Sequence, residues 1–303
     1  MFTTLQLEAG REMEQRIQLK NAVKMNVHYQ KAEGPTVLFL HFSGGTLQMW
    51  NGVIPLFEKE YQIVAPDIRG HGKSDKPVSG YHVDDMANDL YVLLQELNIT
   101  KCHIVGSSMG AEVGLSFAAA HPEMVVSLVC EGAIYNEFGK YGLFHGSEQE
   151  IEAEKDRRRT QLGERKLPVY QTKSEYIEET AKTYREHGHG NEYFQTYIES
   201  CVEETEEGTF TNHYKNYVRT EYIVKYWELR FEDYYKKVRC PVLFLPSEKE
   251  WENEKIRESL KAFASFLESY EIVHIKDSAH AFVWMDQPLV AGEAVKNFIR
   301  KYS

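Results

Sequence analysis

The chain contains 303 residues, a length that fits two domains or one large domain with an insertion. Hydrophobic residues make up 42% of it and charged residues 27%, so a disordered or collagen-like chain is excluded. The 35 Lys and Arg residues against 46 Asp and Glu residues give a net charge of −11, which opposes binding to nucleic-acid phosphates. No apolar run is long enough to cross a bilayer, and no secretory signal is visible near the N-terminus. We therefore expect a soluble, cytoplasmic protein.

The cysteines are few and widely spaced, and none forms a CxxC pair, so a zinc site is not indicated. Most of them lie in or beside apolar runs, which predicts buried free thiols and fits a reducing compartment. The four are Cys102, Cys130, Cys201 and Cys240.

The first 132 residues alternate between strand-like and helix-like segments. Short apolar or alternating runs predict strands, and apolar residues at helical spacing predict helices. Strand–helix–strand alternation with short connections favours a parallel sheet with helices on both faces. The expected strands cover residues 24–30, 37–40, 62–65, 102–105 and 125–130, and the expected helices cover 83–97 and 111–120.

The character of the chain changes at about residue 133. From there to residue 237 it is polar, charged and rich in tyrosine, which predicts a helical insertion. The strand pattern then resumes. We expect a strand at 241–245, a helix at 255–267, a strand at 271–275 and a closing helix at 289–299. The predicted organisation is therefore a first core segment (1–132), a helical cap (133–237) and a second core segment (238–303).

The most informative motif is Gly-Ser-Ser-Met-Gly at residues 106–110, between an expected strand and an expected helix. This is the setting that the G-x-S-x-G pattern requires, because small flanking residues allow the chain to turn sharply. Ser108 has Gly at both −2 and +2, whereas Ser107 does not. The motif predicts that Ser108 is a nucleophile at a helix N-terminus, where the helix dipole favours a developing negative charge.

Two further motifs follow strands. The run His-Phe-Ser-Gly-Gly at 41–45 leaves the strand at 37–40, and such a loop can aim backbone N–H groups at an oxyanion. The expected donors are the amides of Ser43 and Met109. The run DIRGHGKSD at 67–75 is rich in turn residues, and we interpret its Asp67 and Arg69 as structural.

Together these motifs resemble the α/β-hydrolase fold family, in the branch that carries an inserted helical cap. The resemblance covers nearly all of the sheet domain, with the three motifs in the family's order. It implies a mostly parallel eight-stranded sheet with helices on both faces, a Ser–acid–His triad in that chain order, and no cofactor. The family's oxyanion loop usually begins His-Gly, and Phe42 is a departure from that pattern.

The resemblance also implies the remaining triad residues. The family's histidine lies in a loop after the last strand, which makes His280 the general base. The acid usually follows the seventh strand, and counting from the end of that strand places Glu250 at this position. Glu248 on the same loop and Glu131 after the sixth strand remain alternatives.

The nucleophile type limits the chemistry. Members of this fold that cleave alkyl halides or epoxides carry Asp as the nucleophile in the sharp strand-to-helix turn, called the elbow. A serine in that turn forms an acyl intermediate instead. We expect an esterase for a small to medium, largely apolar substrate, with a pocket built from Phe42, Trp50, Trp251 and Trp284. The alternatives are a lactone or C–C-bond hydrolase, and a ligand-sensing regulatory protein on the same fold.

Overall fold

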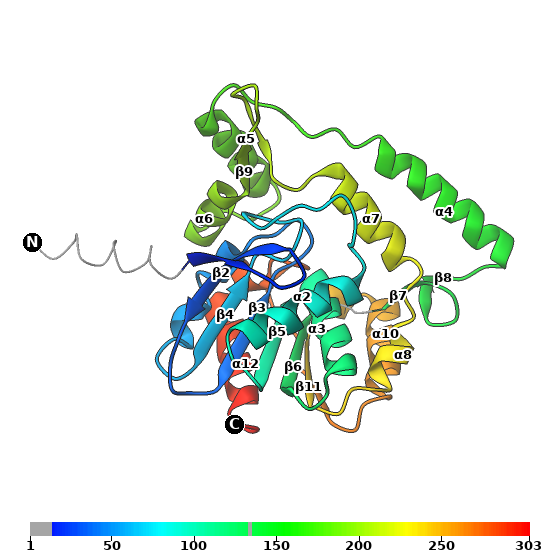
Figure 1. The fold of residues 1–303 in the computed structure, drawn as a ribbon. Helices are drawn as coiled ribbons and strands as arrows, with labels where there is room; N and C mark the ends of the chain where they lie inside the picture. The colour runs from blue at the N-terminus through cyan, green and yellow to red at the C-terminus, as the bar shows by residue number, and fades with distance from the viewer. Residues whose placement is uncertain (1–13, 133–134) are drawn as a thin grey trace, which may run out of the picture.

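The computed structural model describes residues 14–132 and 135–303 (Figure 1). The first ten residues, in which no secretory signal is visible, lie outside them. The described part contains an eight-stranded sheet in the order β1-β2-β4-β3-β5-β6-β11-β12. Strand β2 is antiparallel to β1 and β4, and the remaining pairs are parallel. The strands are β1 (Glu14–Gln18), β2 (Lys24–Gln30), β3 (Thr36–Leu40), β4 (Gln62–Pro66), β5 (Cys102–Ser107), β6 (Val125–Glu131), β11 (Val242–Leu245) and β12 (Tyr270–Ile272).

Helices cover both faces of the sheet, as the sequence predicts (Figure 1). The side chains of β3 explain the two layers, because successive residues of a strand point to opposite faces. Leu38 and Leu40 belong to one hydrophobic core, and Val37 and Phe39 belong to the other. The first core contains α2 (Val83–Glu96), α3 (Met109–Ala120), α8 (Phe231–Tyr235) and α10 (Glu254–Ala264), and the second contains η1 (Leu47–Trp50), η2 (Ile54–Leu56), α11 (Val283–Asp286) and α12 (Pro288–Ile299).

The long segment between β6 and β11 folds mainly into helices beyond the carboxyl-terminal edge of the parallel strands (Figure 1). It also contains two small two-stranded sheets that the sequence did not predict. Near its end, α8 packs on α3 and α10 at the main sheet. The helices are α4 (Glu148–Gly163), α5 (Lys173–Glu186), α6 (Glu192–Cys201) and α7 (Asn216–Tyr226), and the small sheets pair β7 (Asn136–Phe138) with β8 (Gly142–Phe144) and β9 (Val202–Glu204) with β10 (Phe210–Asn212).

The turn-rich run at 67–75 has the structural role expected for it. The buried carboxylate of Asp67 accepts hydrogen bonds from Asn26 and from the backbone N–H groups of Leu47 and Lys73, at 2.8–2.9 Å. The contact with Leu47 ties this run to the segment that follows β3. Arg69 forms an ion pair with the buried Asp89 at 2.5 Å. Both residues therefore hold the loop that follows the carboxyl end of β4.

The four cysteines are buried and free, as expected. Among the described helices, none has the length and apolar character needed to cross a bilayer.

Candidate active site

The turn between β5 and α3 holds Ser108 in a backbone conformation that non-glycine residues seldom adopt, with φ +50° and ψ −118°. A Cβ atom at Gly106 would collide with the backbone of Ala111, and one at Gly110 would collide with the carbonyl of Leu40. Only glycine at both positions allows the strand and the helix to approach this closely. The hydroxyl of Ser108 therefore protrudes at the N-terminus of α3.

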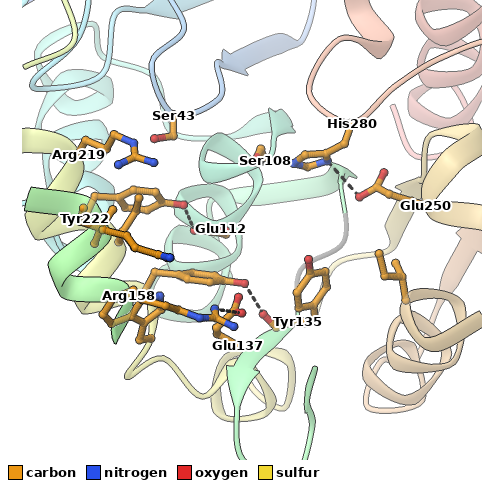
Figure 2. A pocket seen from close by; sticks show the side chains of 16 residues that line it. Ser43, Ser108, Glu112, Tyr135, Glu137, Arg158, Arg219, Tyr222, Glu250 and His280 are labelled. Atoms are coloured by element: carbon orange, nitrogen blue, oxygen red, sulfur yellow. Dashed lines mark hydrogen bonds and ion pairs between the residues drawn. The ribbon is translucent and has the colours of Figure 1, made fainter. Parts of the chain in front are cut away.

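Three side chains form a continuous hydrogen-bonded row at the carboxyl ends of β5, β11 and β12. The Oγ atom of Ser108 lies 3.1 Å from Nε2 of His280. The Nδ1 atom of the same ring lies 3.0 Å from Oε1 of Glu250, as Figure 2 shows. His280 lies in the loop between β12 and α11, and Glu250 lies in the short helix α9 (Glu248–Glu252) after β11. The chain order of the row is Ser, Glu, His.

The two neighbouring serines have different surroundings. Ser107 is buried, and its hydroxyl donates to Oε2 of Glu131 at 2.5 Å. Ser108 lines a cavity and contacts His280. The distinction drawn from the positions of the flanking glycines thus agrees with where the two hydroxyls lie.

The carboxylate of Glu250 is oriented by the start of its own helix. Ser247 is the N-cap of α9, and its backbone N–H and hydroxyl both donate to Oε2 of Glu250, at 3.0 and 2.8 Å. This leaves Oε1 directed at His280. Glu248 has another role, because its Oε2 accepts the backbone N–H of Asp277 at 3.1 Å and so ties α9 to the histidine loop.

Glu131, the second acid near His280, lies at the end of β6 and is fully buried. Its Oε1 accepts the backbone N–H of Ala281 at 3.1 Å and lies 3.7 Å from Nδ1 of His280. Burial raises the pKa of Glu131 to about 7, the charge of Glu250 adds to this, and the charge of His280 opposes it. Glu131 therefore connects the elbow, through Ser107, to the histidine loop.

The two acids also govern the protonation of His280. Burial alone lowers its pKa, but the hydrogen bond to Glu250 and the charges of Glu131 and Glu250 outweigh that effect and raise the pKa to about 9. A general base must be neutral before it can accept a proton. The arrangement therefore stabilises the imidazolium form that follows proton transfer.

The ligand atoms of Glu131, Glu250 and His280 lie within 4.8 Å of one another, a spacing that a metal ion can bridge. Donors from the protein already occupy both carboxylates, because Ser107 and Ala281 bind Glu131 and Ser247 binds Glu250. These contacts satisfy the acids without an ion.

The loop after β3 lies beside the elbow. Ser43 lines the same cavity as Ser108, and Met109 is the first residue of α3, where a backbone N–H has no partner inside the helix. His41 fixes the loop, because its Nδ1 bonds the carbonyl of Phe42 at 2.8 Å and its Nε2 accepts the N–H of Ile68 at 2.9 Å. Burial lowers the pKa of His41, which keeps the ring neutral for this acceptor role.

A cavity of about 700 Å³ opens in front of Ser108 (Figure 2). Much of its wall comes from α4, α7 and the segment after β6, and sequence reasoning did not single out these residues. Glu112 could have been found from the sequence, because a single acid in an otherwise apolar helix indicates a special role. The residues of α7 show only ordinary helical spacing. The lining residues missed are Glu112, Tyr135, Glu137, Arg158, Gln161, Leu162, Arg219, Tyr222, Ile223, Tyr226, Trp227 and Ile256.

The four aromatic residues predicted to form the substrate pocket do not line this cavity. Trp50 and Trp284 are fully buried and pack on each other in the core, with ring centroids 4.9 Å apart. Phe42 packs against Tyr197, and Trp251 stacks on His274. The prediction is corrected, because proximity in sequence to the site residues does not decide which way a ring points.

Comparisons with known proteins give the same fold. A family model described as the alpha/beta hydrolase fold matches residues 35–176. An uncharacterised protein of Mycobacterium tuberculosis is 39% identical over 100 residues, which are 33% of this chain and 29% of that protein. A fluoroacetate dehalogenase of Burkholderia is also 39% identical over 100 residues, covering 31% and 33% of the two chains. The chain thus spans about a third of the length of these curated relatives.

Among solved structures, an E-2-(acetamidomethylene)succinate hydrolase superposes with a TM-score of 0.74 at 21% identity, covering 95% of this chain and 98% of that one. A likeness at this identity concerns the fold alone. With the sheet order, the strained serine between β5 and α3 and the matching family model, it shows that the chain adopts the α/β-hydrolase fold.

Proposed function

We propose that the protein is a serine hydrolase that cleaves an acyl bond, with Ser108 as nucleophile, His280 as general base and Glu250 as the acid. The observation that carries the proposal is the unbroken row from Ser108 Oγ to His280 Nε2 and from His280 Nδ1 to Glu250 Oε1. Partial similarity, at 34–36% identity, to curated proteins named as hydrolases supports the reaction class. We also propose that residues 133–237 form the cap over the site.

The proposed reaction has two steps. His280 takes the Ser108 proton as the hydroxyl oxygen attacks the substrate carbonyl, and the imidazolium then returns the proton to the leaving alcohol. Water, deprotonated by the same ring, next attacks the acyl-serine ester and releases the acid. The backbone N–H groups of Ser43 and Met109 are the proposed donors to the oxyanion in both steps.

An ester is the proposed substrate, and a lactone fits the same chemistry, since both react through an acyl-serine. A serine at the elbow supports acyl transfer, whereas displacement on an alkyl carbon requires a carboxylate nucleophile. The preference for an apolar substrate is not retained, because the rings expected to create it lie elsewhere and charged side chains line the cavity.

The test compares wild type, S108A and S107A on p-nitrophenyl esters from acetate to octanoate. S108A is expected to lose about a thousandfold or more in kcat, because the nucleophile is gone. S107A is the matched control: it removes the neighbouring hydroxyl and retains multiple turnover. An acyl group trapped on Ser108 and detected by mass spectrometry would support the covalent step. Turnover by S108A equal to that of wild type would refute the proposal.

A further inference from the structure

Most of the charged side chains that line the cavity have a partner within the protein. Arg158 of α4 forms ion pairs with Glu137 and Glu154. Glu250 binds His280, and Glu112 accepts the hydroxyl of Tyr222 at 2.7 Å. Each of these groups therefore has a partner within the protein, and none needs a ligand to compensate it.

Arg219 of α7 differs from them. It lines the cavity, and Figure 2 shows its guanidinium directed into the space in front of Ser43 and Ser108. Over residues 14–132 and 135–303, no acidic side chain lies within ion-pair distance of this guanidinium. Its backbone is held in the first turns of α7, where its N–H bonds the carbonyl of Lys215 at 3.1 Å. A half-buried cation thus faces the proposed nucleophile without a counter-charge.

A second cation, Arg165, lies close enough to Arg219 to feel its charge. Arg165 donates to the side chain of Asn216 at 3.1 Å, and its guanidinium lies 5.6 Å from the centre of the Tyr214 ring. Burial and the charge of Arg219 both lower the pKa of Arg165. Two positive charges therefore share this corner of the site, and an anion bound there would relieve their repulsion.

The same corner is coupled to the loop after β3. The Tyr214 hydroxyl lies 2.6 Å from Oγ of Ser43, the residue proposed to donate its backbone N–H to the oxyanion. A group bound at Arg219 thus lies on the cap side of the cavity while the reacting carbonyl lies at Ser108. One molecule can occupy both places.

We infer that the substrate carries a carboxylate, separate from the bond that is cleaved, and that Arg219 binds it. A guanidinium offers parallel N–H donors that match the two oxygens of a carboxylate. The inference deepens the proposed function and rests on it, since it names the substrate class as hemiesters of dicarboxylic acids or lactones of hydroxy- or oxo-dicarboxylic acids. Arg219 is a specificity-determining residue in this scheme, and the carboxylate takes no part in the chemical step.

The test uses matched pairs of substrates. Mono-p-nitrophenyl adipate and suberate carry a free carboxylate, and their methyl p-nitrophenyl diesters have nearly the same size without the charge. Wild type is expected to favour the charged member of each pair by about tenfold or more in kcat/KM, the effect of one hydrogen-bonded charge. R219Q is expected to lose about 10- to 100-fold on the charged esters and to stay within about threefold on the neutral ones.

R185Q is the control. Arg185 is exposed on α5 and does not line the cavity, so its replacement removes the same unit of charge away from the site. It should keep the preference of wild type, and R219K should recover part of it. Equal rates on both members of a pair in wild type, or equal losses in R219Q on both, would overturn the inference.

A second measurement separates this inference from the proposed function. If wild type hydrolyses neither series, the esterase proposal fails, and binding of adipate to S108A by calorimetry decides the carboxylate site. Binding that S108A/R219Q lacks supports the site, with thermal unfolding confirming that the double variant is folded. Absence of binding to S108A overturns it.

Discussion

Replacing Glu250 by glutamine separates the two acids beside His280. Both Ser247 donors point at Oε2 of Glu250, so the carbonyl oxygen of the glutamine is expected to take that place. Its NH₂ group then faces Nδ1 of His280 and favours the tautomer that carries its proton on Nε2. That tautomer cannot accept the proton of Ser108.

The magnitude depends on Glu131, which stays in place in the E250Q variant. At an effective dielectric constant of 20, a unit charge 3.0 Å from the imidazolium contributes about 5.5 kcal/mol, and one at 3.7 Å contributes about 4.5 kcal/mol. Solvent screens both energies, because the side chain of His280 is 45% exposed, but the ratio of the two energies is little affected. Glu131 therefore retains much of the electrostatic stabilisation, and the main loss is of tautomer and orientation.

We expect E250Q to lower kcat by about a thousandfold, somewhat less than the roughly ten-thousandfold cost of a wrong tautomer when no second acid is present. E131Q should cost about tenfold or less. The double variant should lose more than the product of the two, because it leaves the imidazolium without a counter-charge.

The assay is kcat on the best p-nitrophenyl ester for wild type, both single variants and the double variant, with thermal unfolding as a check on folding. If kcat of E250Q stayed near that of wild type while kcat of folded E131Q fell about a thousandfold, the acid would be Glu131. That result would refute the reasoning from the 3.0 and 3.7 Å contacts.

The pH dependence of His280 and the packing of Trp50 give two further predictions. The kcat/KM of wild type should rise with pH as His280 loses its proton, with an apparent pKa drawn towards about 9 by the two acids. E131Q should move this rise in kcat/KM to lower pH, because removing a negative charge 3.7 Å away destabilises the imidazolium. An apparent pKa that stays the same or increases in E131Q contradicts this. Trp50→Phe should lower the free energy of unfolding by about 1–3 kcal/mol while leaving KM unchanged, since the ring is fully buried in the core. Urea unfolding and ester kinetics measure the two effects, and a raised KM would return Trp50 to the substrate pocket.

The sheet could be predicted because its strands carry their own signal. β3 and β11 are continuous apolar runs, which is what burial on both faces requires, and their observed bounds lie within one residue of those expected. β1 was missed because Ile17 is the only strongly apolar residue in an edge strand that is mostly exposed. The small sheets in the insertion are three residues per strand, too short for an alternating pattern to register.

The same reasoning explains the outcome at the site. Ser108 was singled out by the glycines on both sides of it, which the tight turn requires. His280 was singled out by the resemblance to the family, which places its histidine in the loop after the last strand. Sequence position favoured Glu250 for the acid but left Glu131 and Glu248 open, and the structure directs Glu248 to the backbone of Asp277 instead. In the structure Glu250, from α9, and Glu131, from the end of β6, converge on Nδ1 of His280, so the choice between them depends on distances of 3.0 and 3.7 Å.

Arg219 illustrates what sequence cannot supply for a fold with a long insertion. Residues 219, 222, 223 and 226 share one face of α7 at ordinary helical spacing, a pattern typical of packing against a core. That face instead borders the cavity above Ser108, because the insertion crosses the carboxyl ends of the strands. The chemistry that a serine hydrolase performs is therefore predicted by motifs in the sheet domain. The molecule it selects depends on which side chains of the insertion border the cavity. Only the three-dimensional arrangement of the described residues places Arg219 there without an acidic partner among them.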